Sequence, residues 1–479
     1  MFAASQLPPH QLFAACSAQE FAALECQAPQ RIAETQARLL TEHLRYAAEH
    51  SPFYRARFRE RGIDPESIWS IADLARIPCT DKSDLSAHNP EFLAAPKNEI
   101  ADVCLTSAST SDAPCALLQT AADLARLAYN EEAAFGMVGI GPGDTMLMCA
   151  AIDRCFMAGL AYFMGGVKRG ARLVRAGSGS AAQQWQMLKT CGANVMVGVP
   201  SLMRHMGEYA RENGEDPARA GIRTLVAIGE PTRGRGLDLL PAARQAEEMW
   251  GAKIFSTYAS TEIATSFCEC PERCGGHVRP ELIVVEIVDD SGAPLSAGQE
   301  GEIVVTPLGV RGMPLVRFRT GDVSFLIEEP CGCGRQTARL APILGRKNQM
   351  LKFKGTTVFP NAVVAALEGL PEVGGAYVEA HRNPDGTDRI VVYVHVRGVE
   401  PGEKEGRQGR QGQKGQKGQK GQEGKKEEEE RKRLEEEVRA RLRVVPEIRL
   451  VTGEELAARV YETGKRKRTT FFDLRTQRT

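Results

Sequence analysis

The sequence predicts a large α/β domain built on a mostly parallel sheet, together with a β-rich unit and a second, small α+β domain. Three observations lead to this prediction. Apolar strand-like runs alternate with helical patterns between residues 103 and 305, and residues 282 to 327 are rich in strand and turn signals. The character of the chain then changes at a polar joint near Gly345. We therefore expect domains at 1–345 and 346–479.

The composition is that of a globular protein. The 479 residues are too many for one ordinary core, and 42% of them are hydrophobic. Lys+Arg and Asp+Glu both total 61, which argues against a nucleic-acid or anionic-membrane binder. No apolar run approaches the ~20 residues of a membrane span, and no signal peptide is visible. With 13 cysteines, the chain is expected in a reducing, cytoplasmic compartment.

The first domain begins with a helical stretch at 19–90 and continues as βα units. Such units place helices on the faces of a parallel sheet. The predicted strands are 146–151, 171–174, 194–199, 224–228 and 253–257, and the predicted helices are 121–135, 181–191, 201–212 and 241–250.

The second domain combines strands at 376–379, 389–396 and 447–451 with one helix. The apolar face of this helix is formed by Leu434, Val438 and Leu442, which are four residues apart. Between strand and helix, glycine recurs at every third position from Gly406 to Gly424, among Gln, Lys and Arg. The period is that of collagen, but the run is short and contains no proline. We therefore expect a disordered, low-complexity insert at 401–426, and a helix that starts at Glu427.

The stretch from Phe318 to Asp322 lies between apolar runs and predicts a polar turn between two strands. The Asp322 carboxylate can accept hydrogen bonds from the two vicinal hydroxyls of a ribose. Gly321 allows close backbone approach, and Arg319 can face a phosphate. A turn without any ligand is the alternative.

Two other segments follow predicted strands, where ligands bind in parallel sheets. Gly229, Glu230 and Pro231 end one strand, and Tyr258 to Glu262 end another. The Tyr258 ring can stack on a base, and Glu262 can hold Mg²⁺ beside phosphates.

The hydroxyl-rich segment 106–114 can cradle phosphates between strand and helix, or be an ordinary Ser/Thr-rich loop. Near the C-terminus, Lys465 follows a glycine within a basic run. It can be a cation delivered to a phosphate, or part of a solvated tail.

A cluster of cysteines and one histidine has metal-ligand spacing. Cys268, Cys270, Cys274 and His277 follow one another closely, and after 53 intervening residues come Cys331 and then Cys333. Tight Cys/His clusters in a reducing compartment bind Zn²⁺ tetrahedrally, so these candidates compete for four positions. Four protein ligands would make the site structural. Unrelated loop thiols are the alternative.

Taken in order, these segments resemble the adenylate-forming superfamily of acyl-CoA synthetases. Within it, the chain resembles the phenylacetate–CoA ligase branch. The motifs typical of that branch are Ser51-Pro52-Phe53-Tyr54, Ile77-Pro78, Gly229-Glu230-Pro231 and Val358-Phe359-Pro360. The resemblance implies the adenylate-forming enzyme fold, with a mobile C-terminal domain. It also implies an ATP-dependent acid–CoA ligase that forms an acyl-adenylate and then a thioester from an aryl or arylacetic acid.

The resemblance also implies roles for individual residues. ATP, Mg²⁺ and CoA are the expected cofactors and co-substrates, and Zn²⁺ would be structural. Catalysis falls to Lys465 and Glu262, and the acid pocket to Phe156. The nucleotide would contact Ser107, Ser109, Thr110, Ser111, Gly229, Glu230, Pro231, Tyr258, Thr261, Asp322 and Arg346. The zinc ligands would be Cys270, His277, Cys331 and Cys333, with Cys268 and Cys274 as spares.

Some residues depart from the pattern of this branch. Ala108 and Ser111 replace glycines of the phosphate loop, and Ala113 replaces a charged residue. The unusual Asp153 and Arg154 beside Phe156 suggest an acid more polar than phenylacetate, or a salt bridge at the pocket mouth. Two alternative functions stay open: a synthetase that transfers adenylate to another acceptor, such as a deazaflavin cofactor, without using CoA, and a non-catalytic relative. A homodimer also stays open.

Overall fold

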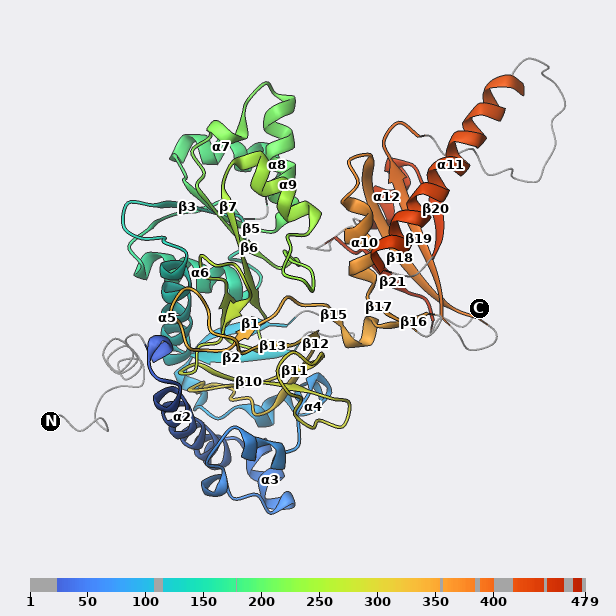
Figure 1. Cartoon of the computed structure of the whole chain (residues 1–479). Helices are drawn as coiled ribbons and strands as arrows, with labels where there is room; N and C mark the ends of the chain where they lie inside the picture. Colours follow the sequence, from blue (N-terminus) through green and yellow to red (C-terminus); the bar gives the residue numbers. More distant parts are fainter. Residues whose placement is uncertain are drawn as a thin grey trace. The chain divides into compact units, whose positions relative to one another are not determined.

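A computed structural model of the chain describes residues 24–106, 115–177, 179–353, 356–383, 388–399, 417–442, 446–460 and 468–475. Its contacts divide the chain into two compact units (Figure 1). The first unit comprises Met1–Leu239 and Ala243–Ile343, and the second comprises Leu240–Ala242 and Leu344–Thr479.

The first unit contains a six-stranded sheet with the strand order β4-β3-β5-β6-β7-β8. All neighbours are parallel except β7 and β8, which form an antiparallel pair. The mostly parallel sheet predicted from the sequence is thereby confirmed. The strands are β3 (Thr145–Met148), β4 (Arg172–Arg175), β5 (Val195–Gly198), β6 (Thr224–Ile228), β7 (Lys253–Ala259) and β8 (Ser266–Cys268).

Helices cover both faces of this sheet, because strand residues alternate between two apolar cores. Leu147, Met196 and Ile254 pack on one face against helices α7 (Ala181–Cys191), α8 (Pro200–Glu212) and α9 (Pro241–Trp250). Met146 and Val197 pack on the other face with residues of α5 (Ala121–Met137) and α6 (Met157–Lys168). No helix in the described ranges is long and apolar enough to cross a lipid bilayer.

A third core of the first unit joins the N-terminal helices to a β unit. The antiparallel sheet β10-β11-β12 packs here, together with residues of the β1–β2 hairpin. A smaller sheet has the order β13-β14-β9. The elements are α2 (Pro29–His50), α3 (Pro52–Arg61), α4 (Lys82–Ala87), β1 (Ile100–Leu105), β2 (Ala116–Thr120), β9 (Gly276–His277), β10 (Ile283–Val288), β11 (Gly301–Pro307), β12 (Phe318–Ser324), β13 (Leu326–Ile327) and β14 (Arg339–Leu340).

The predicted strand–turn–strand at Phe318–Asp322 is wrong. These residues lie within the single strand β12, which pairs with β11 on both sides of a bulge. Glu302 faces Val323 and Val304 faces Arg319, so residues 320–322 bulge opposite one residue of β11. Gly321 has φ +76° at this point, a conformation that glycine adopts without steric cost.

The second unit is an α+β domain, as predicted. Its sheet has the order β20-β19-β18-β21, and its core includes Val378, Val392, Leu434 and Val438. Its elements are β15 (Gly345–Arg346), β16 (Leu351–Phe353), β17 (Thr356–Val358), α10 (Pro360–Glu368), β18 (Val373–Arg382), β19 (Asp388–Val396), α11 (Lys417–Leu442), β20 (Glu447–Leu450), α12 (Gly453–Val460) and β21 (Phe471–Asp473).

Helix α11 starts ten residues before the predicted start at Glu427. Residues 417–426 therefore belong to the helix, although they lie in the segment predicted to be disordered. Gln, Lys and Glu favour helices, and they offset glycines that each cost about 1 kcal/mol. The remaining insert residues, 401–416, lie outside the described residues.

Candidate active site

The candidate ligand-binding segments follow strands β6 and β7, which are neighbours in the parallel sheet. Gly229 follows Ile228, the last residue of β6, and has φ +70°. Strand β7 continues two residues beyond its predicted end and includes Tyr258. Both segments therefore lie at the carboxyl edge of the sheet, where open α/β sheets bind ligands.

Glu230 has a structural partner at this edge. Its carboxylate accepts hydrogen bonds from the Ser201 backbone N–H (3.0 Å) and from the Ser201 hydroxyl (2.6 Å). Ser201 lies in the first turn of α8, whose N–H groups have no intrahelical acceptor. Glu230 thus caps α8, and this fixes the loop that carries Gly229 and Pro231.

Tyr258 and Asp322, both predicted nucleotide-binding residues, lie together. The Tyr258 hydroxyl donates a hydrogen bond of 2.7 Å to Oδ2 of Asp322. The Tyr258 ring stacks on Phe267 of β8, with 6.0 Å between ring centroids. Asp322 is 7% exposed and lies at the end of the β12 bulge. An aromatic ring and a nearly buried carboxylate therefore meet at one point in the first unit.

Thr261 and Glu262 lie in the hairpin loop 260–265, which joins β7 to β8. Both side chains are half-buried, and they line a cavity of about 20 Å³ with Gln119 and Met157. Within the described part of the chain, the Glu262 carboxylate has no hydrogen-bond or ion-pair partner.

Several predicted site residues lie outside the described residues: Ser107, Ser109, Thr110, Ser111 and Lys465. Thr106, the first residue of the hydroxyl-rich segment, and Cys115, the residue that follows the segment, are described. The Thr106 N–H donates to the Cys115 carbonyl (2.9 Å), and the Cys115 N–H donates to the Thr106 hydroxyl (3.1 Å). These two bonds bring the ends of the segment together. Arg346 lies half-buried on β15 of the second unit.

Phe156 is the residue immediately before helix α6 and is half-buried. The Arg154 side chain lies 3.4 Å from the Asp153 carboxylate, and the two side chains are 75% and 64% exposed. The two adjacent residues therefore form an exposed ion pair. An exposed pair of this kind contributes little stability.

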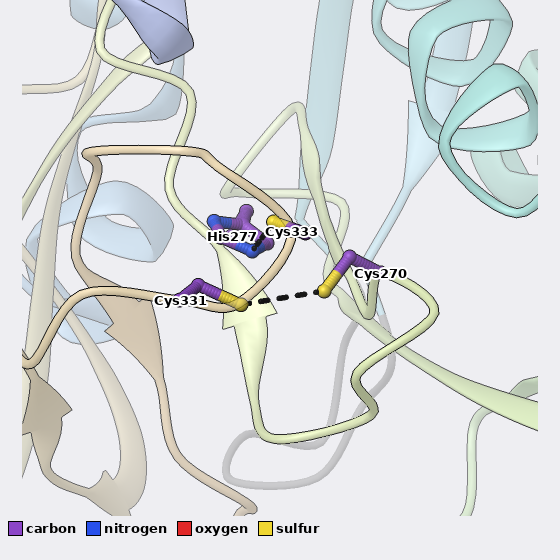
Figure 2. A group of neighbouring side chains, drawn as sticks. All are labelled: Cys270, His277, Cys331 and Cys333. Atoms are coloured by element: carbon purple, nitrogen blue, oxygen red, sulfur yellow. Dashed lines mark hydrogen bonds between the residues drawn. The ribbon is translucent and has the colours of Figure 1, made fainter.

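Cys270, His277, Cys331 and Cys333 form a compact cluster in the first unit. Their ligand atoms all lie within 4.8 Å of one another, and Figure 2 shows the side chains converging from two segments of the chain. The Cys270 and Cys331 sulfurs are 3.6 Å apart, and the Cys333 sulfur lies 3.4 Å from His277 Nε2. Three thiols and an imidazole are a donor set that suits tetrahedral zinc.

The environment of His277 also suits a metal ligand. Its Nδ1 lies 3.2 Å from the Thr337 hydroxyl, a contact that orients the ring and leaves Nε2 facing Cys333. Burial lowers the pKa of His277 to about 4, and the nearby Arg335 adds to this effect. The imidazole is therefore neutral near pH 7, as a ligand must be.

The two spare cysteines have other neighbours. Cys268 lies in the apolar core on strand β8, where its sulfur accepts a hydrogen bond of 3.4 Å from the Thr257 hydroxyl. The Cys274 sulfur lies 2.8 Å from Nη1 of Arg339. Cys274 also packs against the cluster. Neither cysteine is among the four residues whose ligand atoms lie within 4.8 Å of one another.

A buried ion pair near this edge was not predicted from the sequence. Arg233, two residues after Pro231, donates from Nε to Glu269 Oε1 at 2.6 Å, and both side chains are almost fully buried. Glu269 also accepts a hydrogen bond from the Ser256 N–H of β7. The pair joins the loop after β6 to β7. In the sequence, the only sign of the Arg233–Glu269 pair is that the charged Glu269 lies next to Cys270, a candidate metal ligand.

Comparison with known proteins shows what the chain is similar to. The model of the family described as AMP-binding enzyme matches residues 19–311. A phenylacetate-coenzyme A ligase from Thermus thermophilus is 32% identical over 78% of this chain and 83% of its own. One from Pseudomonas putida is 27% identical over 74% of this chain and 81% of its own. A crystal structure of 2-hydroxyisobutyryl-CoA ligase in the postadenylation state has the same fold, with TM-score 0.77 and 24% identity over 93% of this chain and 89% of that chain.

Proposed function

Because this chain belongs to the AMP-binding enzyme family, in its phenylacetate–CoA ligase-like branch, we propose that it is an ATP-dependent, AMP-forming acid–CoA ligase. The observation that supports this most directly is the Tyr258–Asp322 hydrogen bond of 2.7 Å. An adenosine needs an aromatic face for its base and a hydrogen-bond acceptor for its ribose hydroxyls. Tyr258 and Asp322 would supply these, while Gly229, Glu230 and Pro231 would line the adenine side.

In the first half-reaction, an oxygen of the acid's carboxylate attacks the α-phosphorus of ATP. The bond to the bridging oxygen breaks, and pyrophosphate leaves with its electrons. Negative charge accumulates on the phosphates during this step, so cations fixed nearby lower the barrier. Glu262 would hold Mg²⁺ and Thr261 a phosphate, together with Ser107, Ser109, Thr110 and Ser111.

Lys465 would supply a second cation during adenylation, because its ammonium neutralises charge that develops in the transition state. In the second half-reaction, the CoA thiolate attacks the acyl carbon of the adenylate, the acyl–oxygen bond breaks and AMP leaves. A mobile second domain, with Arg346 as a further nucleotide contact, would serve the two half-reactions in turn.

The proposed substrate is an aryl or arylacetic acid, with Phe156 beside its ring. The Asp153–Arg154 pair close to Phe156 motivates a narrower proposal: an acid with a polar substituent, such as a hydroxyl or amino group. A substrate panel in which phenylacetate exceeds every hydroxylated or amino aryl acid would rule this narrower proposal out.

We also propose that Cys270, His277, Cys331 and Cys333 hold a structural Zn²⁺. The ion would supply no chemistry to the reaction, because four protein ligands leave no open position for a substrate. It would fasten the segment after β8 to the loop at Cys331 and Cys333.

The proposed function is tested by measuring AMP and pyrophosphate release with MgATP and a panel of aryl acids, each with and without CoA. The matched pair of variants is Lys465→Ala and Lys467→Ala, because both remove one lysine from the same basic run. We expect AMP release that needs both acid and CoA, and its loss only in Lys465→Ala. Loss of a transition-state cation typically lowers the rate by about 10²–10³.

Two results would contradict the proposal. Product release that does not depend on CoA would indicate that adenylate is transferred to another acceptor. An absence of turnover across the panel, with ATP still bound, would indicate a non-catalytic relative.

A further inference from the structure

The hairpin loop 260–265 is held in place mainly by contacts with a single neighbouring element. The loop carries Thr261 and Glu262, and the pair Ala259 and Ser266 closes it. Ala264 has φ +50°, a left-handed conformation that costs about 1 kcal/mol for a residue with a Cβ. Such a conformation persists only where surrounding contacts fix it. These contacts come from helix α5.

Arg126 of α5 makes the first of these contacts. Its side chain is 1% exposed, and its Nη1 donates a hydrogen bond to the Ala264 carbonyl. Its Nε donates to the Leu308 carbonyl at 2.8 Å, and its Nη2 donates to the Leu282 carbonyl. The guanidinium therefore ties the strained residue of the loop to the β unit of the first unit.

Asn130, four residues later, lies on the same face of the helix and is fully buried. Its Oδ1 accepts a hydrogen bond of 2.7 Å from the Thr265 hydroxyl, and its Nδ2 donates one of 2.7 Å to the Ser266 hydroxyl. Three consecutive residues, 264–266, are thus bonded to two side chains of α5. Buried hydrogen bonds of this kind are costly to leave unmade, so the loop has little freedom to shift.

The same helix is anchored at its other end, directly after β2. Thr120 caps α5 in a capping box with Asp123, and Asp123 also accepts hydrogen bonds from the N–H groups of Arg311 (2.7 Å) and Gly312 (2.9 Å). Strand β2 leads out of the hydroxyl-rich segment 106–114. Helix α5 is therefore the rigid element between that segment and the loop of Glu262.

We propose that Arg126 and Asn130 are positioning residues, which hold the loop in the conformation that lets Glu262 bind the Mg²⁺ of MgATP. This inference rests on the proposed function. Neither side chain reaches the nucleotide; both act through Ala264, Thr265 and Ser266. The alternative role, a purely structural one for the fold, predicts different results in the experiment below.

The test uses Asn130→Ala, with Gln184→Ala as the matched control. Gln184 is also fully buried, on helix α7, and donates a hydrogen bond of 2.7 Å to the Gly177 carbonyl. Because removal of Arg126 can prevent folding, Arg126→Lys serves as a second variant that keeps the charge but not the fork of donors. Melting temperatures of all variants are compared first.

Two readouts follow. The first concerns adenylation and has two parts: the Mg²⁺ concentration that half-saturates ATP binding, measured by calorimetry, and the rate of acid-dependent ATP–pyrophosphate exchange. The second is thioester formation from synthetic acyl-adenylate and CoA, a step that needs no Mg–pyrophosphate. In Asn130→Ala, we expect the Mg²⁺ requirement to rise and exchange to fall, each by about tenfold, while thioester formation stays within about twofold. Gln184→Ala should change neither readout beyond its effect on folding.

The inference is overturned if both half-reactions of Asn130→Ala fall equally and its Mg²⁺ requirement is unchanged. It is also overturned if Mg²⁺ does not tighten ATP binding to the wild type, or if Glu262→Gln keeps the wild-type Mg²⁺ dependence. A wild type that binds MgATP tightly but shows no exchange with any acid contradicts the proposed function alone. The calorimetric comparison then still decides the inference.

Discussion

The Tyr258 hydroxyl donates a 2.7 Å hydrogen bond to Oδ2 of Asp322, across 64 residues of sequence. Tyr258 belongs to β7 of the parallel sheet, whereas Asp322 lies at the β12 bulge of the antiparallel sheet. The bond therefore joins the two sheets that would hold the base and the ribose of ATP. It also orients the Asp322 carboxylate, which we propose accepts hydrogen bonds from the ribose.

Tyr258→Phe keeps the ring for stacking but removes this bond, so Asp322 loses its orientation. A hydrogen bond to a charged group contributes about 1.5–3 kcal/mol. Part of this is retained if water replaces the hydroxyl, so we expect the KM for ATP to rise about 3- to 10-fold with little change in kcat. Steady-state pyrophosphate release at varied ATP measures both constants.

Tyr209→Phe is the matched control for this change. Tyr209 packs against the core formed with helices α7 to α9. The variant Tyr209→Phe should leave the KM for ATP unchanged. If Tyr258→Phe also leaves it unchanged, Tyr258 does not act through Asp322.

Glu131 predicts a dependence of stability on pH. Burial raises its pKa to about 7 from an ordinary value of 4.5, although Ser266 and Asn130 donate hydrogen bonds that oppose the shift. The folded state therefore keeps the proton between these two pH values while the unfolded state loses it. Stability is full below about pH 4.5 and falls as the pH rises to 7, by about 3 kcal/mol in total.

The amide introduced by Glu131→Gln cannot ionise, so this variant should not lose stability as the pH rises from 4.5 to 7. We expect the variant to melt at a higher temperature than the wild type at pH 8, with a smaller difference at pH 5. Glu132→Gln is the control, because the Glu132 side chain is partly exposed and pairs with Lys168 at 3.0 Å. Parallel melting curves of wild type and Glu131→Gln from pH 5 to 8 would contradict the prediction.

The buried Arg233–Glu269 pair should be sensitive to the loss of one partner. In Glu269→Gln, the guanidinium stays buried without a counter-charge, which costs about 3–5 kcal/mol. Denaturant unfolding should show this as a lower midpoint. Glu300→Gln removes the partner of Arg235 in an exposed pair, and should cost less than about 1 kcal/mol. Equal shifts of the unfolding midpoint in the two variants would show that burial of the ion pair does not determine how much stability is lost.

Local sequence signals were sufficient to predict much of the fold. Helix α7 starts and ends where predicted, because Ser180 forms a capping box with Gln183 and Gly192 takes the left-handed C-terminal position. Helix α9 also matches its predicted range. In α7 the pattern of apolar residues and the caps agree, so no distant contact is needed to define the helix.

Features set by contacts between distant segments were not predictable in the same way. The bulge in β12 depends on its register with β11, and a polar stretch with a glycine resembles a turn when that partner is unknown. The capping of α8 by Glu230 joins residues 29 positions apart. Arg126 and Asn130 were missed although their spacing of four is visible, because a polar pair on a helix normally indicates a solvated face.

The proposed zinc site predicts a specific response to the loss of one ligand. Cys331→Ser should lower the metal content, measured by elemental analysis, from about one zinc per chain to near zero. Because the ion would fasten two segments of the first unit, its loss should also lower the melting temperature by about 5 °C or more. Cys268→Ser is the control: its sulfur lies in the core beside Thr257, so this variant should retain zinc. Retention of zinc by Cys331→Ser, together with its loss in Cys274→Ser, would show that Cys274 exchanges its contact with Arg339 for the metal.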